Sequence, residues 1–319
     1  MRRGSTRLRL SLTATWMCFV LSSVASAQAP PGVMAKYLGV AGWEITDGKT
    51  VILVDPYISR LNGPPATEGP SPEGWPSRLS QDDLAIPDTA AVDRRIDRAD
   101  FILLTHGHYV HLLDAPYIAR TRKATIVGNE SVGNIARAYG VPDEQIITVR
   151  GGEDFEFKGF SLRVVPSLHT ALGPPRYYFS SRVAPRDLKP PLRFGDFVEG
   201  GTVAYLIRFG GHQILVFGSM NYIERELEGL RPDVALVPAS PLRRSVHDYT
   251  ARLMRALGSP PLVLATHWDS SGIPYTASHE RQLKEAEGFV AEVKVASPST
   301  KVIIPRHFES IPLPTPARE

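Results

Sequence analysis

The sequence predicts an α/β (α+β) fold in one large layered domain, and three observations lead to this prediction. Short apolar segments typical of strands alternate with amphipathic segments typical of helices through both halves of the chain. Removing residues 1–27, which have the pattern of a signal peptide, leaves 292 of the 319 residues, a length that suits stacked sheets and helices. Three apolar strands far apart in the sequence each end at a histidine, namely His106, His169 and His267.

Residues 1–27 have the composition of a secretory signal peptide. The first nine residues contain four arginines, a mostly apolar stretch covers 10–24, and Ala-Ser-Ala at 25–27 is a small-residue cleavage site. We therefore expect cleavage after Ala27 and a periplasmic or secreted mature protein. The apolar stretch of about 15 residues is shorter than the ~20 that span a bilayer, which disfavours an uncleaved anchor. Sec and twin-arginine export both stay open.

Charge and cysteine content exclude several classes of partner. The signal carries four of the 36 basic residues and no acidic one, so 32 basic and 33 acidic side chains remain. This balance gives no reason to expect nucleic acid or an anionic membrane as the partner. No second apolar segment approaches a membrane span, so we expect none after signal removal. The only cysteine, Cys18, lies in the signal, which excludes disulfides and thiolate ligands from the mature chain.

The first half of the chain reads as strands joined by turns and then by helices. Alternating apolar residues and the Asp47-Gly48 turn predict an opening set of antiparallel strands. Gly140 marks the end of an amphipathic helix, and Gly151-Gly152 precedes another antiparallel pair. The predicted order is strands 36–40, 43–45 and 50–54, a Pro-rich loop 62–87, strand 101–105, helix 114–120, strand 125–127, helix 131–139, and strands 145–149, 154–157 and 160–166.

The second half repeats this alternation after a second Pro-rich passage over 173–200. Its aromatic residues 177–179 either line a substrate pocket or fasten the loop to the core. A hairpin is predicted around Gly210-Gly211, and Asn221 to Glu224 has the pattern of a capping box that opens a helix. The remaining predicted elements are strands 202–209, 213–217 and 234–237, helix 245–257, strand 262–266, helix 279–290 and strand 301–304.

The most informative stretch is Thr105-His106-Gly107-His108-Tyr109-Val110-His111, which places three histidines within six residues directly after an apolar strand. Packing does not explain such a density, because each buried neutral imidazole needs partners for two ring nitrogens. Neutral imidazole nitrogens are good zinc ligands, and short histidine-rich tracts are typical of metal sites. We therefore predict a metal site at this turn. Asp55, which closes another apolar strand before a proline, either starts a turn or orients a ligating histidine.

The strand-end histidines and the Thr-His-Gly-His-x-x-His turn resemble the metallo-β-lactamase fold superfamily, in particular its lactonase-like and phospholipase D-like metallo-hydrolase branch. The matching passages run from about Tyr37 to His267. The resemblance implies a four-layer αββα sandwich over residues 33–315, in which two mixed β-sheets lie face to face with helices outside. It also implies the metal ligands: His106, His108 and His169 for a first zinc ion, and His111 and His267 for a second.

Two positions depart from the pattern of that superfamily. Val110 stands where an aspartate usually precedes the third histidine of the turn, and Ser219 stands where a bridging aspartate usually follows a later strand. Without these carboxylates the second site lacks charge compensation for a dication, so we predict one tightly held Zn²⁺ and a second that is weak or absent. Mn²⁺ or Fe²⁺ are alternatives to zinc.

Other polar residues next to the motifs are candidates for supporting roles. Asp114, Asn221 and Asp269 are candidates to replace the missing groups in part, although capping a helix explains Asp114 as well and a plain turn contact explains Asp269 equally. Ser219 alone is too weak a ligand, and no Gly-x-Ser-x-Gly elbow surrounds it. The remaining histidines are predicted to be surface residues: His212, His247, His279 and His307.

These residues predict an exported metal-dependent hydrolase that acts on a small molecule. A zinc-bound hydroxide would attack an ester, lactone, amide or phosphodiester, while His267 or His111 donates a hydrogen bond to the oxyanion or the leaving group. The alternative is a non-catalytic metal- or ligand-binding member of the same superfamily, which Val110 and Ser219 favour. The sequence does not specify the oligomeric state.

Overall fold

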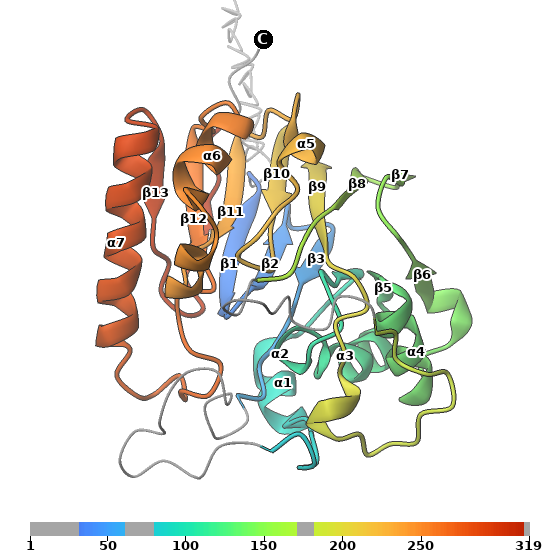
Figure 1. Cartoon of the computed structure of the whole chain (residues 1–319). Coiled ribbons are helices and arrows are strands. Elements are labelled where there is room, and N and C mark those ends of the chain that lie inside the picture. The colour runs from blue at the N-terminus through green and yellow to red at the C-terminus, as the bar shows by residue number, and fades with distance from the viewer. Residues whose placement is uncertain (1–31, 61–79, 171–181, 316–319) are drawn as a thin grey trace, which may run out of the picture. The chain divides into compact units, whose positions relative to one another are not determined.

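Two mixed β-sheets of seven strands each form the framework of the chain (Figure 1). The computed structural model describes residues 32–60, 80–170 and 182–315. The predicted signal peptide, most of the first Pro-rich loop and the aromatic residues of the second lie outside these ranges. Contacts within the chain group residues 31–319 into one unit, and the description that follows concerns this unit alone.

The first sheet has the strand order β14-β1-β2-β3-β4-β5-β6. Strands β14 to β3 pair antiparallel, as the tight turn at Asp47-Gly48 requires, whereas β3 to β6 run parallel because helices connect them. The strands are β1 (Met34–Gly39), β2 (Gly42–Thr46), β3 (Val51–Val54), β4 (Phe101–Leu103), β5 (Thr125–Gly128), β6 (Ile146–Thr148) and β14 (Ser310–Pro312).

The second sheet has the order β13-β12-β11-β10-β9-β8-β7 and the same change of direction along it. Strands β7 to β10 are antiparallel neighbours, and β10 to β13 are parallel. The strands are β7 (Asp154–Phe157), β8 (Phe160–Pro166), β9 (Val203–Phe209), β10 (His212–Val216), β11 (Val234–Pro238), β12 (Leu262–Thr266) and β13 (Lys301–Ile303).

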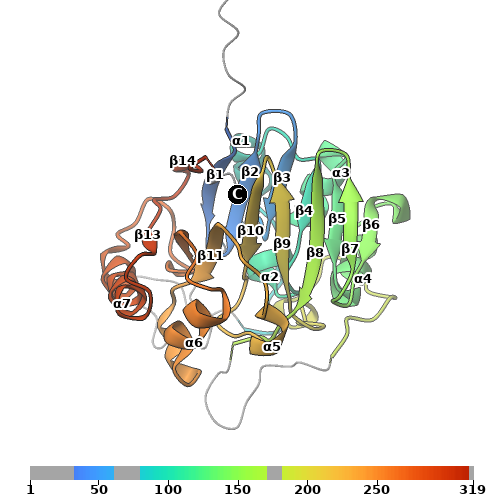
Figure 2. The same cartoon turned by 90° about the horizontal axis from the view of Figure 1, so that it is seen from above.

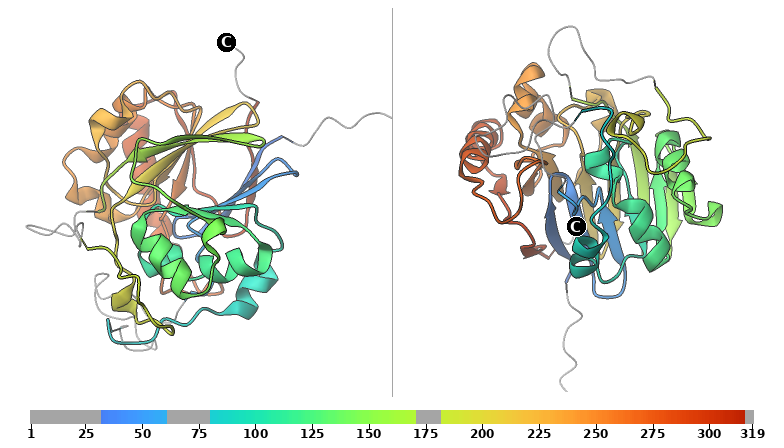
Figure 3. Two further views of the ribbon diagram at one scale, coloured as in Figure 1. Left: turned by 90° about the vertical axis from the view of Figure 1, so that its right-hand side faces the viewer. Right: turned by 90° about the horizontal axis from the view of Figure 1, so that it is seen from below.

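Helices cover the outer face of each sheet (Figure 3). Helices α3 and α4 contact β5, and α4 also contacts β6. On the other side, α6 and α7 contact each other and share a core with the second sheet. The helices are α1 (Thr89–Arg95), α2 (Tyr109–Leu112), α3 (Ala115–Arg122), α4 (Glu130–Ala138), α5 (Glu224–Leu227), α6 (Tyr249–Ala256) and α7 (Glu280–Ala296). Short 3₁₀ turns are η1 (Asp143–Gln145), η2 (Phe194–Asp196) and η3 (Pro241–Ser245).

The hydrophobic core has two parts. The larger part fills the space between the sheets, where Trp43 and Ile45 of β2 belong to the same cluster as Leu162 of β8 and Tyr205 of β9. Figure 2 shows the strands of the two sheets facing each other. A second cluster joins the outer face of the first sheet to its helices. The apolar strands therefore bury both faces, which explains why their sequences are apolar runs more than alternating patterns.

The predicted αββα architecture with two mixed sheets is confirmed, and most elements lie within a few residues of their predicted ranges. Some predictions of local structure are wrong. The predicted helix 245–257 begins later than expected, as α6 at Tyr249, after Asp248 in a left-handed conformation. The capping box at Asn221 does not form, because α5 begins at Glu224 and the Asn221 side chain contacts other segments. Several elements had no prediction, among them α1, the short helix α2 and the short edge strand β14.

Across the described ranges, every helix is too short or too polar to traverse a lipid bilayer.

Candidate metal centre

The sheet topology brings distant parts of the sequence to one edge. Because β8, β10 and β12 run in the same direction, their carboxyl ends lie at the same edge of the second sheet. These ends carry His169, Ser219 and His267 respectively. Parallel strands β3 and β4 likewise end together in the first sheet, before Asp55 and His106. Ligand sites commonly form at such strand ends.

Five histidine rings form one continuous cluster at this edge. The ring centre of His106 lies 4.0 Å from that of His111, 4.8 Å from that of His108 and 4.9 Å from that of His169. The rings of His108 and His169 are 4.7 Å apart, and that of His267 is 5.8 Å from that of His111. The structure therefore brings together all five histidines that the sequence predicted.

Three of these histidines have the geometry of a metal site. One ligand atom from each of His106, His108 and His169 lies within 4.8 Å of the other two. The Nε2 atom of His106 is buried and has no hydrogen-bond partner among the described residues. A buried polar atom without a partner is costly, so its presence in the middle of this group indicates that it faces a bound species.

Hydrogen bonds on the far side of the rings determine which ring nitrogen carries the lone pair. The Thr105 hydroxyl donates to Asp55 Oδ2 at 2.6 Å, and it is then available to accept from His106 Nδ1 at 3.1 Å. His111 Nδ1 lies 2.9 Å from the same carboxylate oxygen. His169 Nδ1 lies 3.2 Å from the carbonyl oxygen of Thr170. These acceptors place the proton on Nδ1 and leave the lone pair of Nε2 for a ligand.

Burial keeps four of these rings neutral, those of His106, His108, His169 and His267. Burial, with the neighbouring imidazoles as a further cause, holds the pKa of His106 and His108 well below the ordinary value. For the same reasons the pKa of His169 is lowered to about 3 and that of His267 to about 4. Neutral imidazoles are the form that binds metal ions, so the cluster stays competent for binding at neutral pH.

Asp55 bonds to His111 directly and to His106 through the Thr105 hydroxyl, as expected if it orients ligating histidines. Besides the bonds to His111 and the Thr105 hydroxyl, its Oδ1 accepts from the Thr105 amide at 2.8 Å. The carboxylate is fully buried. Thr105 itself was not predicted as a site residue, although its position directly before the first histidine of the motif is a signal that could have found it.

Ser219 does not point a free hydroxyl at the cluster. Its Oγ accepts from the Thr170 amide at 2.8 Å and is bonded to the Thr170 hydroxyl at 2.7 Å. Asn221 donates from Nδ2 to the carbonyl oxygen of His169 at 3.1 Å. Both residues therefore hold the loop that carries His169. Thr170 was not predicted, because nothing in the sequence marks it.

The two other candidate carboxylates are turned away from the histidines. Asp114 accepts from the amides of Ile58 and Ser59 at 2.6 and 2.8 Å and from the Ser59 hydroxyl. Its side chain makes no cap for α3, so the capping interpretation is wrong in detail. Asp269 bonds to groups outside the cluster, among them Tyr37 and Arg60. Neither takes the place of a missing metal ligand.

Four histidines were predicted to lie on the surface, and for three of them this prediction is wrong. His212 is 3% exposed and bonds to Asp233 at 2.5 Å, and His279 is 8% exposed. His307 has a side chain that is 11% exposed and bonds to Asp269. Their flanking residues are polar, but tertiary contacts cover the rings. His247 is exposed, as predicted.

Comparisons with known proteins agree with this fold. The profile of the beta-lactamase superfamily domain matches residues 50–268. A UPF0173 metal-dependent hydrolase of Symbiobacterium thermophilum is 24% identical over 275 residues, which cover 84% of this chain and 95% of that protein.

Two solved structures have a similar backbone. The metallo hydrolase Igni18 of Ignicoccus hospitalis has a TM-score of 0.52 at 18% identity, over 88% of this chain and 97% of that one. CmlA, a diiron beta-hydroxylase of Streptomyces venezuelae, has a TM-score of 0.53 at 18% identity, over 89% of this chain and 55% of that one. The profile match over more than half of the residues, together with the two mixed sheets, shows that the chain belongs to the metallo-β-lactamase superfamily.

Proposed function

We propose that this chain is a metal-dependent hydrolase whose metal ion is held by His106, His108 and His169. The observation that carries this proposal is the close approach of three neutral imidazoles, those of His106, His108 and His169. Within this group the Nε2 atom of His106 is buried and has no hydrogen-bond partner among the described residues. The name of the Symbiobacterium relative, a metal-dependent hydrolase, supports the same class of activity. The tautomers and the neutral state of these imidazoles, and the spacing of their ligand atoms, all suit a metal cation.

Zinc is the ion we propose, since three neutral imidazoles are a common ligand set for catalytic zinc; Mn²⁺ and Fe²⁺ are the alternatives. When bound, such an ion lowers the pKa of a coordinated water to about 7 and polarises a substrate oxygen. We propose small-molecule esters, lactones, amides or phosphodiesters as the substrate class.

The other two histidines would handle protons beside the metal. Because His111 has its Nδ1 proton directed at Asp55, its Nε2 carries a lone pair and suits a proton acceptor more than a donor. His267 is neutral at pH 7, since burial lowers its pKa to about 4, and a neutral imidazole has one N–H to donate. We therefore assign the hydrogen bond to the oxyanion or leaving group to His267, and proton acceptance to His111.

The environment of Ser219 and Val110 supports a single tight metal ion. Val110 offers no ligand atom, and the Ser219 hydroxyl is engaged by Thr170. Among the described residues, the candidate ligands for a second ion are His111 and His267, and neither replaced position supplies a carboxylate ligand to balance its charge. We therefore propose one tightly bound ion and a weak or absent second.

A non-catalytic metal- or ligand-binding role is the second candidate. The same two replacements favour it, because both carboxylates that commonly serve a second metal are missing. The two candidates differ in turnover and agree on the metal site at His106, His108 and His169.

Metal analysis and hydrolysis assays test both. The purified chain is dialysed with zinc and assayed on chromogenic aryl esters, a lactone and a bis-aryl phosphate. We expect one retained equivalent of zinc and turnover of at least one substrate, with losses of several orders of magnitude in His106→Ala and His169→Ala. His247→Ala, at an exposed position, is the matched control and should match wild type. Zinc retention without turnover would support the binding role, and unchanged activity in His106→Ala would reject the site.

Export is a separate proposal with its own measurement. The arginine-rich start, the apolar stretch and the Ala-Ser-Ala site support cleavage after Ala27 and delivery to the periplasm or the outside. Cell fractionation followed by mass spectrometry of the recovered protein should show a chain that starts at Gln28. A full-length protein in the cytoplasmic fraction would contradict it.

A further inference from the structure

A single buried carboxylate, that of Asp269, gathers four hydrogen-bond donors just beyond the histidine cluster. Its Oδ1 accepts from the Tyr37 hydroxyl at 2.5 Å and from the Val40 amide at 2.8 Å. Its Oδ2 accepts from His307 Nε2 at 2.8 Å and from the Arg60 guanidinium. The side chain of Asp269 has no exposed surface. Because both oxygens are fully engaged, this carboxylate is not a metal ligand.

The donors come from segments with unusual backbone conformations. Val40, Arg60, His267 and Phe308 all have positive φ angles, of 53°, 43°, 49° and 62°. Two of these residues donate to Asp269 directly, Phe308 follows the donor His307, and His267 precedes Asp269 by two positions. A positive φ is unfavourable for side chains other than glycine, and most of all for a β-branched valine. Such residues persist only where surrounding contacts hold them, and they gather at functional sites.

Reciprocal bonds link Asp269 to the backbone of His267. The His267 amide donates to the carbonyl oxygen of Val40 at 2.5 Å, and the Val40 amide donates in turn to Asp269. The turn at Val40 is therefore clamped between the histidine and the carboxylate. We propose that Asp269 is a positioning residue that holds His267 in its left-handed conformation, so that the imidazole faces His111 within the cluster. The role of His267 in hydrolysis rests on the proposed function, whereas its placement does not.

The ion pair between Asp269 and Arg60 is better explained by the positions it imposes on its segments than by a gain in stability. Replacing a buried ion pair with apolar residues is often neutral or stabilising, so stability alone is a weak reason for its presence. The chain also leaves space for the Arg60 guanidinium at Gly39. Gly39 has a positive φ, and a Cβ at this position would collide with the Arg60 guanidinium. The guanidinium lies over the Tyr275 ring, 4.4 Å from its centre.

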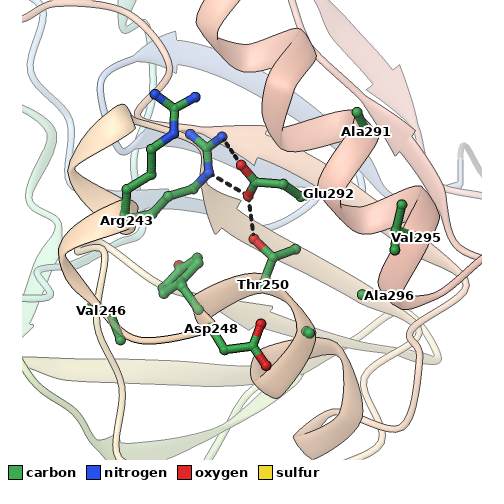
Figure 4. Close-up of a pocket in the computed structure, with 11 residues that line it drawn as sticks. Arg243, Val246, Asp248, Thr250, Ala291, Glu292, Val295 and Ala296 are labelled. Carbon is green, nitrogen blue, oxygen red and sulfur yellow. Dashed lines mark hydrogen bonds and ion pairs between the residues drawn. The ribbon is translucent and has the colours of Figure 1, made fainter.

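The chain offers a control in a second buried arginine, Arg243, whose carboxylate partner Glu292 is 36% exposed. Figure 4 shows Glu292 of α7 accepting hydrogen bonds from Arg243 and Thr250. Arg243 is 1% exposed, like Arg60 in being buried, and none of the five histidines is among the partners of Glu292 in the described ranges. Glu292→Gln therefore weakens the ion pair of a buried arginine without acting on the histidine cluster.

The test compares Asp269→Asn with Glu292→Gln in the full chain with one equivalent of zinc added. Long-range ¹H–¹⁵N NMR of the imidazole rings reports on His267, whose signals are assigned by their loss in His267→Gln. We expect both variants to fold less stably, with the folding equilibrium constant reduced roughly 100-fold in Asp269→Asn. Only Asp269→Asn should shift or broaden the His267 signals. Unchanged His267 signals in that variant, or equal changes in Glu292→Gln, would overturn the proposal.

A milder variant keeps the test decisive where Asp269→Asn does not fold. Tyr37→Phe removes one donor to Oδ1 and leaves the ion pair intact, so the same His267 signals should move by a smaller amount. An unaltered His267 ring in Tyr37→Phe would then overturn the proposal. The same spectra recorded without zinc distinguish this inference from the proposed function. Failure of wild type to bind zinc rejects the metal site, while a displaced His267 ring in the metal-free variant still supports the positioning role.

Discussion

Asp55 Oδ2 lies 2.9 Å from Nδ1 of His111, and this single carboxylate supports two histidines of the cluster at once. It binds His111 directly and reaches His106 through the Thr105 hydroxyl. The residue is fully buried, so no water competes for these bonds. The charge on Asp55 therefore fixes the tautomers on one side of the proposed metal centre.

Removing this carboxylate should weaken metal binding. In Asp55→Ala we expect zinc affinity to fall by roughly 10- to 100-fold, the usual effect of losing a group that orients a ligating histidine. Competition with a chromophoric chelator measures the affinity. Asp100→Asn is the control, because this aspartate accepts from the Val51 amide at the opposite end of the same strands. Equal affinities in Asp55→Ala and wild type would contradict the assignment.

Ser219→Asp should create a second metal site. An aspartate there would add a negative charge at the strand-end edge that also carries His267, so we expect two equivalents of zinc after dialysis instead of one. Isothermal titration and elemental analysis give the stoichiometry. Ser219→Asn, of the same shape and without the charge, should retain one equivalent. A wild-type protein that already retains two would show that the serine does not limit binding.

The stability of the fold should depend on pH through Asp114. Burial raises its pKa to about 6, against hydrogen bonds from Ser59 that favour the charged form. The folded chain thus holds the proton more tightly than the unfolded one, whose value is 3.8. This contribution to stability is complete below pH 4 and is lost as the pH rises through 6.

Asp114→Asn removes that dependence. We compare the free energies of unfolding of Asp114→Asn and wild type at pH 4 and at pH 7. Their difference should move by about 3 kcal/mol in favour of the variant as the pH rises, since each pKa unit corresponds to ~1.4 kcal/mol. Urea unfolding at a series of pH values measures it. Asp82→Asn, at an exposed position, serves as the control. A constant difference between Asp114→Asn and wild type would show that the buried carboxyl does not titrate in this range.

Gly107 is required by the close packing of the histidine turn. Its amide donates to the carbonyl oxygen of Glu199 at 2.9 Å, and a Cβ here would collide with the carbonyl oxygen of Val198. Gly107→Ala should therefore cost about 1–3 kcal/mol of stability and weaken zinc binding, since the turn carries His106 and His108. Gly288→Ala is the contrast. That site lies in α7 with its closest contact at 3.5 Å, so alanine should be neutral or stabilising in thermal unfolding.

The order of the strands along the chain and the members of the histidine cluster could be predicted from the sequence. Apolar runs, Gly-containing turns and strand-end histidines are local signals, and the local backbone preferences agree with the final fold. The five histidines were predicted from spacing and from resemblance, and the fold brings all five together. Asp248 shows where local signals fail, because its left-handed conformation precedes α6, which begins at Tyr249 and not at the predicted residue 245.

Only the tertiary structure decided which polar residues serve the cluster. Asp55, Asp114 and Asp269 have similar sequence contexts at strand or helix ends, yet the first orients histidines, the second bonds to a neighbouring loop and the third binds Arg60. Their partners lie between 50 and more than 200 positions away. His279 and His307 were likewise misjudged, since their rings are covered by contacts with each other and with residues distant in the sequence. Hydrogen bonding over such separations depends on three-dimensional packing, which a local pattern does not encode.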